Sequence, residues 1–178
     1  NRRILLFLML CYFVSILDRA NISVASLTMN QALGFSPAVY GFGAVIFFFG
    51  YLLFEVPSNI ILGKVGAPIW IARIMTTWGI VTVFMILIHN STSFFTMRFL
   101  LGVAEAGFYP GVIYYLSQFY PKEHRTKAIG WFQLASPVAL MIGTPAIGLI
   151  LSLHGTLGFE GWQLIFLLTG IPAIILGV

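Results

Sequence analysis

The stretch ILLFLMLCYFVSILDRANISVASLTM, residues 4–29, decides the fold class. It is long enough to cross the ~30 Å hydrocarbon core of a bilayer as an α-helix, which rises ~1.5 Å per residue. It nevertheless holds two charged residues, Asp18 and Arg19, side by side. A charge at bilayer depth costs at least ~2.5 kcal/mol and is tolerated mainly where it faces a bundle interior, a partner or water. We therefore expect a transmembrane helix whose charges have a function.

The composition extends this expectation to the whole chain. Hydrophobic residues make up 60% and charged residues 8% of the 178 residues, and the mean hydropathy is +1.00. These values lie outside the range of soluble domains. The net charge of +4 comes from basic residues in short gaps between apolar runs, which indicates membrane orientation and not a nucleic-acid partner. Cys11 is the single cysteine, so we expect no disulfide framework, no metal site and no bound cofactor.

A window of about 20 residues, the length of a membrane-spanning helix, finds six candidate spans. Glycine and proline residues mark the short gaps between them, and no linker divides the chain. We therefore expect an all-α polytopic membrane protein with six transmembrane helices in one domain, residues 1–178. The expected helices cover residues 4–29, 39–62, 69–88, 94–119, 127–152 and 161–178.

The distribution of basic residues predicts the orientation of these helices. Seven of them fall on one side of the predicted membrane, and the gaps at 30–38, 89–93 and 153–160 contain none: Arg2, Arg3, Lys64, Arg73, Lys122, Arg125 and Lys127. Positive residues favour the cytoplasmic side, so we expect a multi-pass protein of the inner or plasma membrane with a cytoplasmic amino terminus. Trp70 and Trp162 begin their spans, where an indole favours the headgroup level. Because the chain opens on Asn1 and stops in an apolar run, we expect a fragment of a longer protein.

Three prolines fall inside the fourth and fifth spans, namely Pro110, Pro137 and Pro145. A proline removes a backbone hydrogen bond and bends its helix, so these two spans are not expected to be straight. The bends could serve helices that must rock during a functional cycle. The alternative is that the many glycines and prolines only allow close packing between helices.

Four charges lie deep in the spans, namely Asp18, Arg19, Arg98 and Glu105. Arg98 and Glu105 are two turns apart and share a helix face, whereas Asp18 and Arg19 point about 100° apart. If the first and fourth spans are neighbours, Asp18 can meet Arg98, and Glu105 can meet Arg19. The alternative is static pairing, with Arg98 extending to the nearby membrane surface. An apolar pair would hold two helices at lower cost, so we favour a functional role for Arg19 and Glu105.

The chemistry of these groups predicts coupled transport. A buried carboxyl group near a cation can exist in either protonation state. Protonation of Glu105 would release Arg19, and a free guanidinium at low dielectric is a strong site for an organic carboxylate. We therefore expect symport of protons with a small organic anion.

A second polar group lies near the cytoplasmic end of the second span. It consists of Glu55, Pro57, Ser58 and Asn59. We interpret it either as a cytoplasmic gate or as a packing motif.

Four stretches of the chain resemble the anion:cation symporter family of the major facilitator superfamily, and within it the bacterial tartrate and sugar-acid permeases. They are LDRANIS (residues 17–23), GYLLFEVPSN (50–59), WIARIMTTWG (70–79) and RFLLGVAEAGFYPG (98–111), the last followed by Phe119, Tyr120 and Pro121. The resemblance implies that the chain is the amino-terminal half of a twelve-helix transporter. It further implies a 3+3 inverted repeat within that half, and a substrate site between the two halves.

The resemblance also implies roles for single residues. Asp18 and Glu105 match the proton-coupling carboxylates, and Arg19 matches the arginine that contacts the substrate carboxylate. Arg98 matches an arginine of the charge network, and Tyr51 a pocket tyrosine. A pocket glutamine of the fifth helix falls on Ser136, with Gln133 one turn away, which leaves the substrate open. In this superfamily the loop between the second and third helices usually carries one acidic and several basic residues, which hold the cytoplasmic side closed. Here that loop has only Lys64, so this contact is either weaker or supplied by Arg73 and Glu55.

Other functions are compatible with parts of the sequence. A drug or metabolite exchanger of the same fold is the main alternative, although a neutral or cationic substrate would leave Arg19 without a purpose. A structural membrane subunit is a further alternative, against which the buried charges argue. An enzyme or a channel would need a nucleophile with its base, a metal motif or a pore-lining ring, and the sequence has no such pattern.

Overall fold

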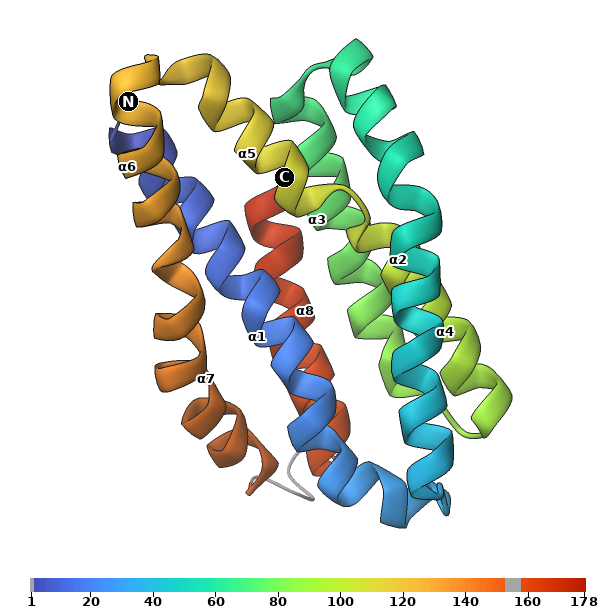
Figure 1. Cartoon of the computed structure of the whole chain (residues 1–178). Coiled ribbons are helices and arrows are strands. Elements are labelled where there is room, and N and C mark those ends of the chain that lie inside the picture. The colour runs from blue at the N-terminus through green and yellow to red at the C-terminus, as the bar shows by residue number, and fades with distance from the viewer. Residues whose placement is uncertain (1, 153–157) are drawn as a thin grey trace.

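The computed structural model describes residues 2–152 and 158–178, and in these ranges all regular structure is helical (Figure 1). The elements are α1 (Arg2–Leu33), α2 (Pro37–Val65), α3 (Ala67–Phe84), the 3₁₀ turn η1 (Met85–Leu87), α4 (Ser91–Glu105), α5 (Phe108–Phe119), α6 (Lys122–Gln133), α7 (Ala135–Leu151) and α8 (Gly161–Gly177).

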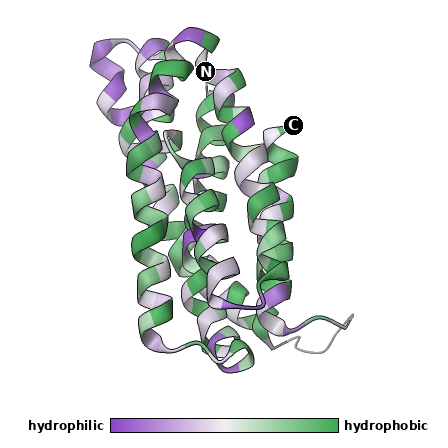
Figure 2. Ribbon diagram, turned by 90° about the vertical axis from the view of Figure 1, so that its right-hand side faces the viewer, coloured by the Kyte–Doolittle hydropathy of each residue, from purple (hydrophilic) through white to green (hydrophobic). Residues whose placement is uncertain are grey.

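These helices group into six apolar spans. Five segments are long and apolar enough to cross a membrane: Arg3–Leu33, Pro37–Val65, Ala67–Leu87, Ser91–Phe119 and Lys122–Leu151. The sixth, α8, has 17 residues and would extend ~25 Å. Most of the ribbon is coloured hydrophobic along the helices, and hydrophilic residues gather most strongly at the end of the bundle that holds the amino terminus (Figure 2). The expected all-α, multi-pass membrane architecture is confirmed.

Two of the expected helices are interrupted. The span expected at 94–119 breaks after Glu105, where Gly107 adopts a left-handed conformation with φ 86°. Pro110 has no N–H to donate to the carbonyl of Ala106, four residues earlier. Ser58 Oγ on α2 donates to that carbonyl instead, over 2.7 Å.

The fifth span breaks in a related way. The helix expected at 127–152 begins earlier, at Lys122, and α6 ends at Gln133. Pro137 lacks the N–H that would reach the Gln133 carbonyl. By contrast, α7 continues through Pro145. Two of the three prolines singled out in the sequence therefore coincide with a helix break.

The packing of the spans has an internal symmetry. Span one (α1) packs on span five (α6 and α7) and span six (α8), while span four (α4 and α5) packs on span two (α2) and span three (α3). Spans three and six pack on each other. Exchanging the first three spans with the last three reproduces this set of contacts, and corresponding spans run in opposite directions. The bundle is thus a 3+3 inverted repeat, with α1 and α4 as equivalent inner helices.

The core contains large aromatic side chains and close helix contacts. Trp78, Phe108 and Phe132 are buried in one cluster, and Phe94 and Trp162 in a second. Trp162 stands in the first turn of α8 and is 2% exposed, so its indole packs inside the bundle at that end of the span.

The contact between α3 and α8 is close because of two glycines. A Cβ atom on Gly79 would lie 2.8 Å from the Gly170 carbonyl oxygen. These glycines let the two backbones approach closely, so the third and sixth spans pack tightly against each other.

Candidate functional site

Arg19 and Glu105 form an ion pair in the middle of the bundle. Arg19 Nε on α1 donates to Glu105 Oε2, at the end of α4, over 3.0 Å. The Glu105 side chain is 1% exposed and the Arg19 side chain 36%. The pairing expected from the sequence is therefore confirmed, and its cation faces an open space while its anion is enclosed.

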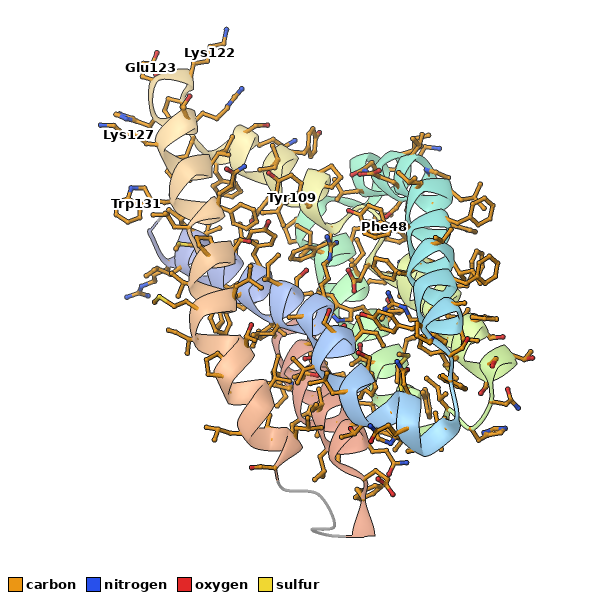
Figure 3. All side chains as sticks on the ribbon, turned by 60° about the horizontal axis from the view of Figure 1, so that its bottom comes forward. Phe48, Tyr109, Lys122, Glu123, Lys127 and Trp131 are labelled. Carbon is orange, nitrogen blue, oxygen red and sulfur yellow. The ribbon has the colours of Figure 1, made fainter. Side chains whose placement is uncertain are left out.

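That open space is a cavity of about 250 Å³ lined by Tyr12, Arg19, Phe48, Tyr51 and Tyr109. The Arg19 guanidinium carbon lies 5.3 Å from the centre of the Tyr51 ring. Phe48 on α2 and Tyr109 on α5 are labelled in Figure 3. One cation surrounded by aromatic rings and phenol hydroxyl groups can bind an anion with polar substituents.

A second cavity, of about 190 Å³, adjoins the first because Arg19 and Phe48 line both. Its wall contains all four of the charged residues singled out in the sequence: Asp18, Arg19, Arg98 and Glu105. The structure therefore brings the predicted charge network together at one place.

Asp18 has different partners from the expected one. Its Oδ2 accepts hydrogen bonds of 2.9 Å from both Trp78 Nε1 and Thr82 Oγ1, and its Oδ1 accepts one of 3.1 Å from Asn21 Nδ2. Within the described residues no Asp18–Arg98 ion pair forms. Asp18 is 4% exposed, and three neutral donors, two on α3 and one on α1, take the place expected for Arg98.

Sequence analysis missed these donors, although a signal exists. Trp78 and Thr82 are four residues apart and so share one face of the third span. Two hydrogen-bond donors on one face of an apolar helix indicate a buried acceptor on a neighbour. Asn21 also donates to Thr169 Oγ1, which links the Asp18 cluster to α8.

Arg98 is buried inside the bundle. It is 6% exposed, donates from Nε to the Gly43 carbonyl over 3.3 Å, and lies 4.6 Å from the centre of the Phe47 ring. The alternative that Arg98 extends to the membrane surface is therefore wrong. Arg98 adds positive charge beside Asp18 and Glu105 in the same cavity wall.

The two candidate polar residues of the fifth span, Gln133 and Ser136, each lie beside a tyrosine that lines the cavity. Gln133, the last residue of α6, donates from Nε2 to Tyr109 Oη over 2.7 Å. Since Tyr109 lines the cavity, Gln133 is connected to it through one hydrogen bond. Ser136 is half-buried on α7.

The expected gating residues lie toward the amino-terminal end of the bundle. Asn59 Nδ2 donates to the Glu55 carbonyl on its own helix over 2.8 Å, and Lys64 is exposed in the last turn of α2. Arg73 lies 4.7 Å from the centre of the Trp70 ring. In the described ranges Arg73 and Glu55 do not form an ion pair.

Trp70 connects the helices at this end of the bundle to the break in span four. Its Nε1 donates to Ser58 Oγ over 2.9 Å, and Ser58 donates in turn to the carbonyl at the break of span four. This chain of hydrogen bonds joins α3 and α2 to the segment directly after Glu105.

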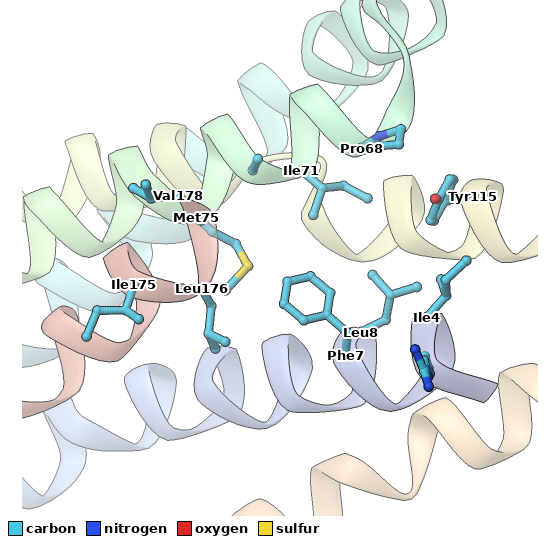
Figure 4. A pocket seen from close by; sticks show the side chains of 13 residues that line it. Ile4, Phe7, Leu8, Pro68, Ile71, Met75, Tyr115, Ile175, Leu176 and Val178 are labelled. Atoms are coloured by element: carbon cyan, nitrogen blue, oxygen red, sulfur yellow. The ribbon is translucent and has the colours of Figure 1, made fainter. Parts of the chain in front are cut away.

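The described residues also bear on a metal site and on an apolar cavity. Among the residues that the structure describes, no group of three or more His, Cys, Asp and Glu side chains could hold a metal ion. A further cavity, about 550 Å³, lies between α1, α3, α5 and α8, and most of the side chains that line it are apolar (Figure 4). It contains none of the four buried charges, so the smaller cavities beside Arg19 define the candidate site.

A broken-helix six-span bundle with a buried charge network is typical of membrane transport proteins. The model of the Major Facilitator Superfamily matches residues 8–178, and the chain belongs to this family. The match places it among membrane transport proteins and not among enzymes.

The relatives agree with this family. A protein of Agrobacterium vitis named "Putative tartrate transporter" is 56% identical over 176 residues, which cover 99% of this chain and 41% of that protein. The "Quinolone resistance transporter" of Acinetobacter baumannii is 48% identical over 171 residues, or 96% of this chain and 39% of that protein. The chain thus spans about 40% of the length of these relatives.

A solved structure shows the same fold. It is the crystal structure of a bacterial homologue of the human lysosomal transporter Spinster in an inward-facing, occupied conformation, with a TM-score of 0.85 and 24% sequence identity. The match covers 99% of this chain and 42% of that one.

Proposed function

We propose that this chain is the amino-terminal half of a secondary active transporter that carries an organic carboxylate together with protons by alternating access. The observation that carries the proposal is the ion pair of Arg19 and Glu105, whose cation faces a cavity and whose carboxylate is enclosed. A buried ion pair is an expensive way to join two helices, so its presence beside a cavity supports a role in binding.

The proposed exchange takes place at the Arg19 guanidinium. Its Nε donates to Glu105 and its guanidinium also faces Tyr51, so a carboxylate of the substrate would compete with these partners for the arginine. An arginine can bind a carboxylate through two parallel hydrogen bonds, which is stronger than a single contact. Substrate binding and protonation of Glu105 would then favour each other. A substrate carboxylate on Arg19 would leave Glu105 without its cation, and a protonated Glu105 would no longer attract Arg19.

Asp18 is proposed as the second proton-coupling residue. Its three neutral donors suit the ionised carboxylate, which accepts hydrogen bonds only. When Asp18 takes up a proton, one of these contacts must reorganise. Since the donors come from α1 and α3, protonation would alter the contact between an inner and an outer helix. Arg98 would stabilise the ionised forms of Asp18 and Glu105, which line the same cavity.

The cavity favours a small hydroxylated acid as substrate. Tyr51 and the Tyr109–Gln133 pair supply polar groups beside Arg19, and Ser136 lies one turn beyond Gln133. Tartrate, named for the relative of Agrobacterium vitis, is a dicarboxylate with two hydroxyl groups and has this chemistry.

A quinolone is the second candidate substrate. It carries a carboxylate on a flat aromatic ring system, and four aromatic residues surround Arg19 in the cavity. The relative of Acinetobacter baumannii is named for quinolone resistance. This alternative would make the protein a drug exchanger that uses the same arginine.

The wider organisation follows from the same proposal. The other wall of the substrate site would come from a carboxyl-terminal half of the same polypeptide, and the amino terminus would lie on the cytoplasmic side of the inner or plasma membrane. The end of the bundle with Glu55, Asn59, Lys64 and Arg73 would close during the cycle. The hydrogen bonds of Trp70 and Ser58 would couple that closure to the break after Glu105.

The test is uptake by the full-length protein in proteoliposomes with an imposed pH gradient. Radiolabelled tartrate, galactonate and norfloxacin are offered separately to wild-type protein and to Arg19→Gln. We expect concentrative uptake of one hydroxylated acid, and its loss in Arg19→Gln. Arg3→Gln, which removes an exposed arginine far from the pair, should transport normally. Unchanged uptake affinity in Arg19→Gln would rule out the substrate role.

A further inference from the structure

A long groove lies on the outside of the bundle, between α1 and the α6–α7 span. Two cavities of about 490 and 390 Å³ form it, and they are continuous because Leu6, Met9 and Trp131 line both. The groove is separate from the charged site, since neither Arg19 nor Glu105 lines it. Trp131 is 59% exposed and Leu6 63%.

The two ends of the groove differ in chemistry. One end is lined by His124 and Lys127 of α6, together with Tyr120. The other end is lined by apolar side chains such as Leu10, Leu134 and Val138. Lys127 and Trp131 lie on the outer side of α6 and point away from the bundle (Figure 3).

The basic end carries a surplus of positive charge. Lys127 lines the groove and no acidic residue among those described does, whereas Lys122, Glu123 and Arg125 belong to the same helix but do not line the groove. In the part of the chain that the structure describes, Lys127 and Glu123 do not form an ion pair, although they are one turn apart. The Lys127 ammonium therefore suits an anion supplied from outside the bundle.

The length of the groove indicates what kind of molecule fits it. From Lys127 to Val138 the α6–α7 span rises ~16 Å at ~1.5 Å per residue. This is about half of the ~30 Å hydrocarbon core, or the depth of one leaflet. A transmembrane helix would continue across the whole core, whereas a phospholipid occupies one leaflet with its phosphate at the surface.

We propose that this groove binds an anionic phospholipid, with its phosphate on Lys127 and His124 and an acyl chain along Leu6, Leu10 and Val138. Basic pockets between transmembrane helices are sites for anionic headgroups, and one basic residue near the membrane surface contributes about 1 kcal/mol. Trp131 lies between the two parts, where an indole with an apolar body and a polar N–H suits the boundary of headgroup and hydrocarbon.

The test uses the fluorescence of Trp131 in the full-length protein. The purified protein is placed in nanodiscs with a small fraction of phosphatidylglycerol or phosphatidylcholine that is brominated on its acyl chains, because bromine quenches a nearby indole. The contribution of Trp131 is the part of the quenching that disappears in Trp131→Phe. We expect half-maximal quenching at a lower fraction of brominated phosphatidylglycerol than of phosphatidylcholine.

Two variants distinguish a specific contact between Lys127 and the lipid headgroup from an effect of the net charge of the helix. Lys127→Gln should reduce the preference for phosphatidylglycerol about fivefold, the equivalent of about 1 kcal/mol. Lys122→Gln makes the same charge change at the tip of α6, outside the groove, and should leave the preference unchanged. Equal quenching by both lipids, or equal effects of the two variants, would overturn the proposal. Absence of quenching by either lipid would also overturn it, since another part of the polypeptide would then cover the groove.

Discussion

Arg19 holds only one of the two oxygens of Glu105. Nε donates to Oε2 over 3.0 Å, whereas the buried Oε1 has no hydrogen-bond partner within the described ranges. An unsatisfied buried acceptor costs free energy, so this pair is weaker than a fully hydrogen-bonded one. The geometry suits a contact that is broken and remade during a cycle.

Glu105→Gln keeps the shape of the side chain but removes its ability to bind and release a proton. We expect the full-length variant to exchange substrate across the membrane in counterflow while losing uptake driven by a pH gradient. The measurement is the ratio of gradient-driven to counterflow uptake in proteoliposomes. Uphill accumulation at the wild-type level would show that Glu105 does not couple protons.

Trp78→Phe removes one of the three donors to Asp18 and leaves its ring packing largely intact. Loss of one partner of a buried polar group costs about 1–3 kcal/mol, so we expect a lower unfolding temperature in detergent. The cost should shrink in an Asp18→Asn background, because the carboxylate that needs the donor is gone. Equal costs in both backgrounds would mean that Trp78 acts by packing alone.

Ser58→Ala removes the hydroxyl that donates to the Ala106 carbonyl at the break of span four. Pro110 cannot replace this donor, so we expect a loss of about 1 kcal/mol or more in the free energy of unfolding. The matched control is Ser117→Ala, whose hydroxyl donates to a backbone carbonyl of its own exposed helix face. Similar unfolding temperatures for the two variants would argue against a special role for Ser58.

Gly79→Ala tests the close contact between α3 and α8. A Cβ there would lie 2.8 Å from the Gly170 carbonyl, and such overpacking costs about 1–3 kcal/mol. Gly148→Ala is the control, since a Cβ at Gly148 in α7 meets no atom within 4 Å. We expect thermal unfolding to shift down only for Gly79→Ala, and an equal shift in both would contradict the packing argument.

The sequence was sufficient to predict the spans and one ion pair. Long apolar runs between glycine and proline residues are a strong signal because a bilayer fixes the length of a helix. Arg19 and Glu105 were predictable as partners because two opposite charges in hydrocarbon have few other ways to be satisfied. The break after Glu105 was harder to place, since a proline predicts a missing hydrogen bond but not the donor that replaces it.

The partners of Asp18 could not be predicted with the same reasoning. Charge matching favoured Arg98, but a buried carboxylate can also be satisfied by neutral donors. Which of these donors reach Asp18 depends on how α3 rotates against α1. That rotation is set by packing around Trp78 and by the close contact at Gly79, which a single sequence does not specify.

The central claim is that a substrate carboxylate displaces Glu105 from Arg19 and that Glu105 then takes up a proton. The most direct measurement is calorimetric titration of the full-length protein with its carboxylate substrate in two buffers of different ionisation enthalpy, which gives the protons taken up per substrate bound. We predict net proton uptake in the wild-type protein and a clear decrease in Glu105→Gln. Tight binding by the wild-type protein with no proton uptake in either buffer would contradict the claim.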